Sequence, residues 1–404
     1  MAPPSARASE ETIAKLAQDP ACAAALAWIA KNSDWVTEQQ ILLAEIPAPE
    51  FHEARRGQFL ANLFEAAGLP VHTDSAGNVI AKRPGSDSAA ILFVAHLDTV
   101  FPEGTDVRVK RDGHRLLAPG ISDNAAGLSA LAGLARAFGE FAARTRKTII
   151  LAGDVGEEGE GNLRGIRALV ETHRAQLAAV LAVDGAPVDY VATQAIASRR
   201  LEVVVTGPGG HSWSDFGAPN PITALSRGVV HFSSIRLPDE PRSTYNFGAI
   251  EGGTSVNSIP PRVAMKVDLR SEDASELIRL ESALRAAIEA GVRDEISATR
   301  ASHDALLLSF RSIGARPSGK LQNNSPLLAA IRDVDRFLGV SSRLESSSTD
   351  ANIPLSLGIP AVALGGGGTG GGSHTLAEWY DPTGRELGLK RLFLIALALA
   401  GLDR

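Results

Sequence analysis

The chain has 404 residues, 44% of them hydrophobic and 21% charged, which is enough for two globular domains and a sizeable core. Its formal net charge is −6 and it has no long basic run, which argues against a nucleic-acid partner because phosphate binding needs clustered Lys and Arg. The single cysteine, Cys22, excludes an internal disulfide framework, suits a reducing compartment, and is expected to pack on an apolar helical face.

The N-terminal segment Met1–Ser9 lacks the basic region and apolar block of a signal peptide. The apolar stretches Ala21–Ala30 and Leu392–Leu402 are too short to span a bilayer. We therefore expect a cytoplasmic protein with no membrane partner.

The first half of the chain predicts helices followed by an alternation of strands and helices. Helices are expected at Glu10–Lys31, Trp35–Leu43 and Glu53–Ala67, the last ended by Gly68-Leu69-Pro70. Apolar runs of strand length then alternate with helical stretches such as Ala125–Phe138. The four runs are Ile91–Ala95, Thr148–Ala152, Ala179–Val183 and Pro360–Leu364. This pattern predicts an α/β domain with a mostly parallel central sheet flanked by helices.

The pattern changes near Ser198, where strand-like runs begin to alternate apolar and polar residues, as a half-exposed antiparallel sheet would. Three such runs and two amphipathic helices are expected, at Leu201–Val205, Arg262–Leu269, Ala305–Ser312, Pro221–Arg236 and Ala274–Gly291. The α/β pattern resumes with a helix at Ser325–Leu338. We therefore predict a discontinuous α/β domain, residues 1–197 and 317–404, with an inserted α+β domain at 198–316.

Candidate ligand side chains follow the predicted buried strands or lie in loops that face the same sheet edge. They are His96, Asp98, Asp123, Glu157, Glu158, Asp184 and His374. Because the carboxyl ends of parallel strands face the ligand-binding crevice of an α/β sheet, we expect these side chains at one sheet edge. Taken singly, His96 could be a buried structural histidine, Asp123 a helix N-cap, and the Glu157–Glu158 pair part of a solvated loop.

With Asp98 set aside as a partner of the His96 ring, and one of the two adjacent glutamates taken as a ligand, two His, two Asp and one Glu form a set of nitrogen and oxygen ligands without a thiolate. Such a set suits Zn²⁺, with Co²⁺ or Mn²⁺ as substitutes. Five ligands exceed the need of one tetrahedral catalytic zinc, and a bridging carboxylate would divide them between two ions about 3.5–4 Å apart. The sequence therefore predicts a two-metal site.

The chain resembles the M20 metallopeptidase family, whose members include peptidase T, carboxypeptidase G-type enzymes and aminoacylases. The matching motifs are His96-Leu97-Asp98, Ser122-Asp123-Asn124, Glu157-Glu158-Gly159, Val183-Asp184, Gly207-Pro208-Gly209-Gly210-His211-Ser212, Asn257-Ser258-Ile259-Pro260, Asp268-Leu269-Arg270, Thr349-Asp350-Ala351-Asn352 and His374. They occur in the family's order from about residue 40 to the C-terminus, and look most like the peptidase T-like dipeptidases and tripeptidases.

The resemblance implies a zinc exopeptidase-like fold in which the inserted domain is a lid and dimerisation domain. It implies two Zn²⁺ per chain, one held by His96, Asp123 and Asp184. The other would be held by Asp123, Glu158 and His374, with Asp123 bridging.

The resemblance also assigns roles to residues that are not ligands. Glu157 would be the general base and Asp98 the residue that orients His96, and the peptide bond Asp123–Asn124 would be cis. His211 would stabilise the oxyanion, usually from the lid of the partner subunit. Asn257 and Arg270 would grip the substrate's carboxylate.

The remaining glycines and histidines receive structural interpretations. Gly365–Gly372 lacks the Lys-Ser/Thr of a phosphate loop, so it should either let backbone approach the substrate and place His374 or form a flexible loop. The other histidines, assigned to surface or structure, are His52, His72, His114, His173, His231 and His303.

The predicted function is that of a dinuclear zinc hydrolase that cleaves amide bonds of small peptides with a free carboxylate, acting as a homodimer joined through the inserted domain. An N-acyl- or N-carbamoyl-amino-acid amidohydrolase would use the same site. A catalytically silent peptide-binding member of the fold is the non-enzyme alternative. A dinuclear phosphoesterase is disfavoured because no basic pocket is evident.

Overall fold

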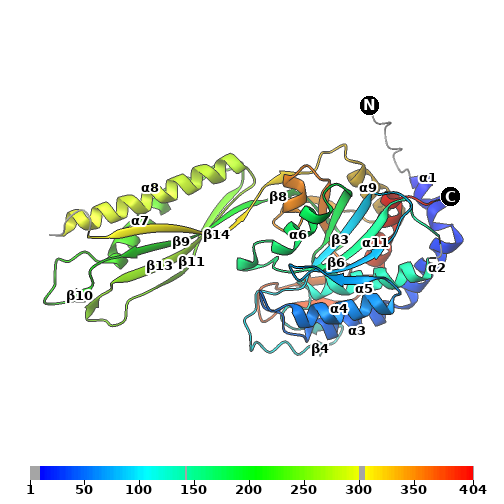
Figure 1. Ribbon diagram of the computed structural model, residues 1–404, viewed down its shortest axis with the longest axis horizontal. Helices are drawn as coiled ribbons and strands as arrows, with labels where there is room; N and C mark the ends of the chain where they lie inside the picture. Colours follow the sequence, from blue (N-terminus) through cyan, green and yellow to red (C-terminus); the bar gives the residue numbers. More distant parts are fainter. Residues whose placement is uncertain (1–9, 142, 300–304, 404) are drawn as a thin grey trace. The chain divides into compact units, whose positions relative to one another are not determined.

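The computed structural model describes residues 10–141, 143–299 and 305–403, and its contacts divide the chain into two compact units. Met1–Ala195 together with Gly319–Arg404 form one, here called the α/β unit, and Ile196–Ser318 form the inserted unit (Figure 1). The predicted class, an α/β fold with an inserted α+β domain, is confirmed. The divisions fall within two residues of those expected from the sequence.

The α/β unit is built on a sheet with the strand order β1-β2-β6-β3-β7-β17-β8-β15, and β16 pairs with β8. Its strands are β1 (Val71–Thr73), β2 (Val79–Arg83), β3 (Ala90–His96), β6 (Thr148–Asp154), β7 (Leu177–Val183), β8 (Tyr190–Ala195), β15 (Gly319–Lys320), β16 (Arg343–Ser347) and β17 (Ala361–Leu364). The centre, from β6 through β3 and β7 to β17, is parallel, and antiparallel pairs flank it. β3 is buried at every position, as its apolar run predicts.

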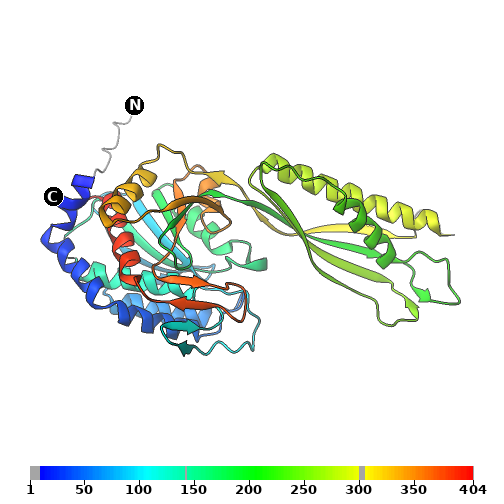
Figure 2. The same ribbon diagram turned by 180° about the vertical axis from the view of Figure 1, so that it is seen from behind.

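Helices cover both faces of this sheet. They are α1 (Glu10–Ala17), α2 (Pro20–Lys31), α3 (Ser33–Ala44), α4 (Ala54–Ala66), α5 (Ala125–Glu140), α6 (Arg164–His173), α9 (Pro326–Leu338), α10 (Asn352–Ser356) and α11 (Arg385–Ala400), with a 3₁₀ turn η1 (Gly159–Gly161). The chain runs from β3 through α5 to β6 on one side of β3, and then from β6 through α6 to β7 on the other side of β3. Because the two connections cross the sheet in opposite directions and such crossovers are right-handed, α5 and α6 lie on opposite faces. α11, red in Figure 2, packs with α5 against β3.

The predicted helix Glu10–Lys31 is in fact two helices. α1 ends at Ala17, and α2 begins at Pro20 with Asp19 as its N-cap. The Asp19 carboxylate accepts the N–H of Ala21 at 3.0 Å, and proline is favoured at the first helical position because it needs no N–H partner there. The Asp19-Pro20 pair therefore marks the start of a second helix within a segment whose apolar pattern predicts a single one.

A second small sheet in the α/β unit was not predicted. Its order is β18-β19-β5-β4, formed by β18 (Thr369–Gly371), β19 (Trp379–Asp381), β5 (Arg115–Leu117) and β4 (Lys110–Asp112). β19 pairs with β5, which brings the C-terminal glycine-rich segment beside the loop that precedes α5. Both segments carry predicted metal ligands.

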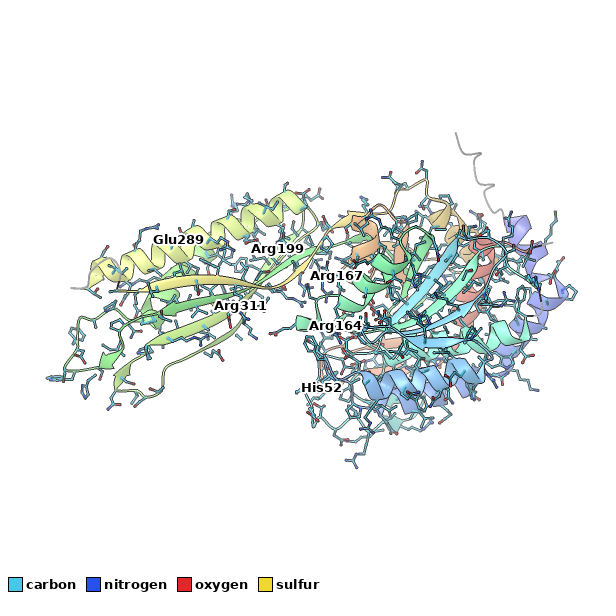
Figure 3. The ribbon with its side chains drawn as sticks, viewed as in Figure 1. His52, Arg164, Arg167, Arg199, Glu289 and Arg311 are labelled. Carbon is cyan, nitrogen blue, oxygen red and sulfur yellow. The ribbon has the colours of Figure 1, made fainter. Side chains whose placement is uncertain are left out.

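The inserted unit is a four-stranded antiparallel sheet covered on one face by two helices. Its elements are β9 (Ala197–Thr206), β11 (Ser243–Gly252), β13 (Arg262–Ser271), β14 (Leu307–Arg316), α7 (Pro221–Ser233) and α8 (Ala274–Ala298), with strand order β11-β13-β9-β14. A separate short pair joins β10 (Gly210–His211) to β12 (Ser258–Ile259). Leu201, Val203 and Val205 alternate into the core of the inserted unit. Glu202, between them, pairs instead with Arg311, which is labelled in Figure 3, at 2.9 Å.

The prediction that this unit's long helix ends at Gly291 was wrong. α8 continues to Ala298, and Gly291 packs against α7. A Cβ added at Gly291 would lie 2.2 Å from the backbone nitrogen of Gly228, so the glycine permits close helix packing and does not end the helix. Among the residues that the structure describes, no helix is both long and apolar enough to cross a membrane.

Candidate metal centre

Three strand ends bring polar side chains together at the carboxyl edge of the parallel strands. His96 is the last residue of β3, and Asp184 directly follows β7. Glu157 and Glu158 follow β6, which pairs in parallel with β3 so that His96 lies opposite Asp154. The strand register thus places the predicted ligands of separate loops at one edge.

Asp123 lies between the two predicted histidine ligands and offers one oxygen to each. Its Oδ1 is 3.1 Å from His96 Nε2, and its Oδ2 is 3.3 Å from His374 Nε2. Asp184 Oδ1 is 3.9 Å from His96 Nε2, and Glu158 Oε1 is 3.0 Å from His374 Nε2. A carboxylate whose oxygens face two different ligand groups has the arrangement that a shared ligand requires.

Three groups in the described part of the chain have ligating atoms within 4.8 Å of one another. They are His96–Asp123–Asp184, Asp123–Glu158–His374 and His96–Glu157–Glu158. The first two are the sets that the family resemblance implies, and the third brings Glu157 within reach of the same cluster. Imidazole nitrogens and carboxylate oxygens without a thiolate are ligands suited to Zn²⁺, so the residues present fit a divalent cation.

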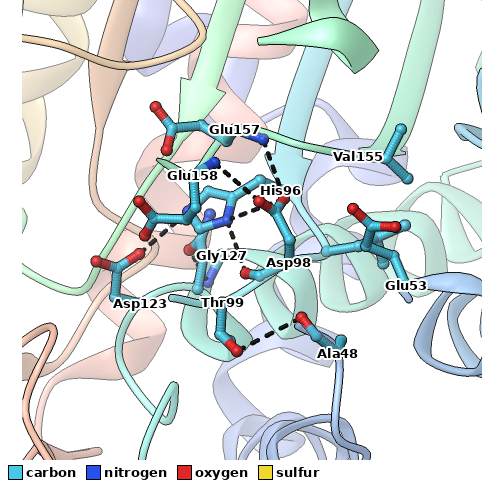
Figure 4. Close-up of polar contacts among 12 residues, drawn as sticks. Ala48, Glu53, His96, Asp98, Thr99, Asp123, Gly127, Val155, Glu157 and Glu158 are labelled. Atoms are coloured by element: carbon cyan, nitrogen blue, oxygen red, sulfur yellow. Dashed lines mark hydrogen bonds and ion pairs between the residues drawn. The ribbon is translucent and has the colours of Figure 1, made fainter. Parts of the chain in front are cut away.

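Asp98 makes different contacts from those expected of it. The His96 ring nitrogen Nδ1 is 3.0 Å from the carbonyl oxygen of Asp98, whereas the nearest carboxylate oxygen of Asp98 is 3.8 Å away. The carboxylate instead accepts the backbone N–H groups of Glu157 at 3.0 Å and Glu158 at 2.8 Å (Figure 4). The carbonyl of Asp98 therefore orients His96, and its carboxylate fixes the backbone of the adjacent glutamates.

The loop that carries Asp123 is tied to the end of β7. The peptide bond Asp123–Asn124 is cis. The Asn124 side chain donates to Val183 O at 2.9 Å and accepts the N–H groups of Gly127 and Gly185. A Cβ at Gly127 would lie 2.2 Å from Val183 O, so α5 can approach the strand this closely only with glycine there.

His374 is reached through the glycine-rich segment. Its own φ is 65°, a left-handed backbone conformation uncommon for a residue other than glycine. A Cβ at Gly370 would lie 2.2 Å from the hydroxyl oxygen of Ser122, so the segment passes directly against the Asp123 loop. Gly370 therefore permits a close approach of this backbone to the Asp123 loop, on the way to His374.

The cluster shifts the pKa values of its members in opposite directions. Burial, with repulsion among the carboxylates, raises the pKa of Glu158 to about 7 and that of Asp184 to about 8. Hydrogen bonds to Asp123 and Glu158 raise the pKa of His374 to about 10. Burial also acts on Asp123, but hydrogen bonds from His374 and His96 outweigh it and hold its pKa well below the usual value. Without a cation, protons therefore balance the negative charge.

Sequence reasoning gave no role to several buried charges beside the cluster. Asp154 and Asp350 are 0% and 3% exposed, and burial raises the pKa of Asp154 to about 8. Arg56 is also fully buried and donates to the carbonyl oxygens of Leu97 and Ile46 at 2.8 Å and 2.7 Å. Asp154 was recognisable as a strand-end carboxylate, but nothing in the sequence distinguishes Arg56 from a surface residue of an amphipathic helix.

The remaining predicted site residues lie in the inserted unit, at opposite ends of its sheet. His211, in β10, accepts the N–H groups of Trp213 and Ser214 at its Nδ1 atom. Asn257 lies beside it, since its carbonyl oxygen accepts the N–H of Ser212 at 3.0 Å. Arg270 is near the far end of β13, where its Nε donates to Asp268 at 2.7 Å.

The strand β13 separates Arg270 from the His211 region. β13 begins at Arg262, next to the β10–β12 pair, and Arg270 lies eight residues further along. At 3.4 Å per residue this amounts to about 27 Å. One inserted unit therefore brings His211 and Asn257 together but does not bring Arg270 to them.

Comparison with known proteins identifies the family. Residues 92–398 match the sequence model of peptidase family M20/M25/M40. The chain belongs to this family of metallopeptidases and amidohydrolases, and it is a hydrolase. It is 26% identical over 355 residues to YqjE, an uncharacterized protein of Bacillus subtilis, covering 82% of this chain and 90% of that one.

Solved structures share the fold at low sequence identity. A tripeptidase from Staphylococcus aureus is 20% identical with a TM-score of 0.74, covering 91% of this chain and 99% of that chain. Aminopeptidase PepT from Bacillus cereus is 21% identical with a TM-score of 0.70, covering 92% and 99%. An amidase of the hydantoinase/carbamoylase family from Burkholderia vietnamiensis is 19% identical with a TM-score of 0.68, covering 92% and 96%.

Proposed function

We propose that this protein is a dinuclear zinc hydrolase that cleaves amide bonds of small peptides with a free C-terminal carboxylate. The observation that carries the proposal is the position of Asp123, whose two oxygens face His96 and His374 separately. A site for a single ion would not need a histidine facing each of the two oxygens of one carboxylate.

In the proposed site, one Zn²⁺ is held by His96, Asp123 and Asp184, and the other by Asp123, Glu158 and His374. When bound, the ions supply Lewis-acid chemistry that acidifies water and polarises a carbonyl group. Co²⁺ or Mn²⁺ would serve as substitutes, since they accept the same ligands.

Glu157 is the proposed general base. Its backbone is held by the Asp98 carboxylate, next to the proposed ligand Glu158. It would take a proton from the attacking water and return it to the leaving amine nitrogen, so that one carboxylate serves both steps. Because its ligating atoms lie close to those of His96 and Glu158, the alternative role for Glu157 is that of a metal ligand. The substitution Glu157→Gln distinguishes the base from the ligand.

His211 is the proposed hydrogen-bond donor to the oxyanion. Its Nδ1 accepts two backbone N–H groups, so in the neutral ring the proton is on Nε2, which is then a donor. Arg270 is the proposed anchor of the substrate's carboxylate. Because the two lie at opposite ends of the inserted sheet, we propose that they reach one substrate from different chains of a homodimer.

Small peptides are favoured as substrates by the likeness to a tripeptidase and an aminopeptidase. The likeness to a carbamoylase-type amidase supports the second candidate, an N-acyl- or N-carbamoyl-amino-acid amidohydrolase on the same site. Both candidates would use the same ligands and base, and they differ in the group that precedes the scissile bond.

The test combines metal analysis with a substrate panel. Protein saturated with Zn²⁺ should contain two ions per chain by elemental analysis, lose activity on chelation and regain it with Zn²⁺, Co²⁺ or Mn²⁺. The panel comprises di- and tripeptides, their C-terminally amidated forms, and N-acyl- and N-carbamoyl-amino acids. Cleavage of free peptides in preference to amidated ones is the expected result. A single ion with no weaker second site would contradict the dinuclear proposal, and preferential cleavage of carbamoyl substrates would support the second candidate.

A further inference from the structure

Glu378 connects the segment that carries His374 to the loop that carries Asp123. Its side chain is 0% exposed. One carboxylate oxygen, Oε1, accepts the N–H groups of Ser122 and Asp123, both at 2.8 Å, and the other, Oε2, accepts the N–H of Gly120 at 2.9 Å. All three donors belong to the backbone that leads into Asp123.

The backbone of Glu378 adds to the same connection. Its carbonyl oxygen accepts the N–H of Ala118 at 3.2 Å, and its N–H donates to Thr375 O at 3.2 Å. Thr375 N donates in turn to Gly372 O, so the chain from Gly372 to Glu378 is a hydrogen-bonded turn that includes His374. The separation between Glu378 and His374 is therefore fixed locally.

The chemical character of the residue is informative because a carboxylate is costly to bury. An unpaired buried carboxylate is strongly unfavourable, and here three N–H groups of one loop compensate it. A glutamine in the same place would offer one acceptor oxygen and direct an NH₂ group at a backbone N–H. The loop therefore requires both oxygens of a carboxylate, although Glu378 is not among the groups whose atoms could hold an ion.

We propose that Glu378 is a positioning residue, which fixes Asp123 and His374 relative to each other so that the two can bind the same ion. It holds the backbone of Asp123 through N–H groups and holds His374 through the turn between residues 372 and 378. The inference rests on the proposed function, because it concerns the ion that Asp123, Glu158 and His374 would share.

The test measures Zn²⁺ binding to Glu378→Gln by calorimetry, starting from metal-free protein. Loss of one acceptor should weaken Zn²⁺ binding most at the site formed by Asp123, Glu158 and His374, by about ten- to a hundredfold, the effect usual for residues that orient ligands. The other site, which shares Asp123, should be weakened less. Circular dichroism and the Tm of the metal-free variant should stay close to wild type. Glu378→Asp keeps two acceptor oxygens on a shorter side chain and should recover part of the affinity.

Glu386→Gln is the matched control, since it makes the same chemical change in the first turn of α11, eight residues further along. It should leave both affinities unchanged. Equal affinities in Glu378→Gln and wild type would overturn the inference. So would a loss of folded protein in both Glu378 variants, because the residue would then be needed for the whole unit and not for two ligands. Failure of wild type to bind two ions would instead contradict the proposed function.

Discussion

The two units of this protein hold their functional side chains in opposite ways. In the α/β unit, the candidate ligands lie at the ends of buried parallel strands, and each loop is tied to the next by a side chain with a defined partner. Asp98 connects the first strand end to Glu157 and Glu158, and Asn124 connects the Asp123 loop to β7. In the inserted unit, His211 and Asn257 are exposed, and Arg270 lies at the other end of the sheet.

This difference follows from what each unit must do with charge. A cluster of carboxylates and histidines can be held ready for a cation only if the surrounding chain is rigid, and the backbone contacts of Asp98 and Asn124 contribute to that rigidity. Groups that contact a substrate need exposure before binding, so they can lie on the surface of a small sheet. The α/β unit therefore carries a complete candidate centre, and the inserted unit carries parts that require a further component.

The largest expected effect concerns the adjacent glutamates of the α/β unit. Glu157→Gln should lower kcat by about 10²–10⁴-fold, the usual contribution of a general base, while the bound zinc stays near the wild-type amount. Glu158→Gln should lower zinc occupancy, because it removes a ligand oxygen 3.0 Å from His374 Nε2. Steady-state kinetics and elemental analysis of the same preparations measure both quantities.

The opposite pattern would reverse the two roles. If Glu157→Gln lost zinc and Glu158→Gln kept it, the group formed by His96, Glu157 and Glu158 would be a real ligand set and another residue would be the base.

A smaller effect is expected from the exposed residue of the inserted unit. His211→Ala should lower kcat by about 10²–10³-fold, the cost of losing one oxyanion donor. Inactive His211→Ala and inactive Glu157→Gln chains, unfolded and refolded together, should recover roughly a quarter of wild-type activity. Half of the dimers would be mixed, and each mixed dimer would have one complete site of two.

Each variant refolded alone is the control for this mixing experiment. No recovery on mixing, with dimers present by light scattering, would mean that His211 serves the site of its own chain. A fully active monomer would rule out the homodimer as well as the contribution of a second chain.

The site was more predictable than the elements around it, for a physical reason. Strand ends and the side chains that follow them can be recognised from short apolar runs, which predicted His96, Glu157, Glu158 and Asp184. Asp123 and His374 lie in loops, and were predicted from the segment before a helix and from the glycine run. All six lie together in the structure. The small sheet of β18, β19, β5 and β4 was missed because its strands are three residues long and because its two hairpins are joined by the pairing of β5 with β19, which are far apart in the chain. No local periodicity can reveal such a pairing.

Contacts through backbone atoms were equally invisible to sequence reasoning. Asp98 was expected to orient His96 through its carboxylate, because side chains two apart in an extended strand share a face. In the structure the carboxylate of Asp98 is occupied by the N–H groups of Glu157 and Glu158, and its carbonyl oxygen is the atom nearest the His96 ring. A residue type predicts the chemistry, but the backbone geometry decides which of its atoms performs it.

The smallest expected effect is on stability, and it tests whether protons hold the α/β unit together when no cation is bound. The pKa values of Asp154 and Asp184 are raised to about 8 in the folded chain, mainly by burial, so folding takes up protons there. A raised carboxyl pKa contributes stability below the ordinary value near 4 that is lost as the pH rises toward the folded value. The raised pKa of His374 acts in the same direction above its ordinary value.

The Tm of the metal-free protein should therefore fall between pH 6 and pH 8. Each proton lost contributes about 1.4 kcal/mol per pH unit, and 1 kcal/mol corresponds to about 2–4 °C in a domain of this size. Saturation with Zn²⁺ should make the fall less steep, because the cation takes the place of the protons on the proposed ligands Asp184, Glu158 and His374. Asp154→Asn is the control variant: it removes one of the titrating groups and should make the fall less steep.

Calorimetry at several pH values measures how steeply the Tm falls. If the inserted unit melts separately, the fall should belong to the transition of the α/β unit. A Tm that rises with pH in the metal-free protein would mean that these carboxylates are already ionised in the folded chain, and that the cluster is held by its histidines alone.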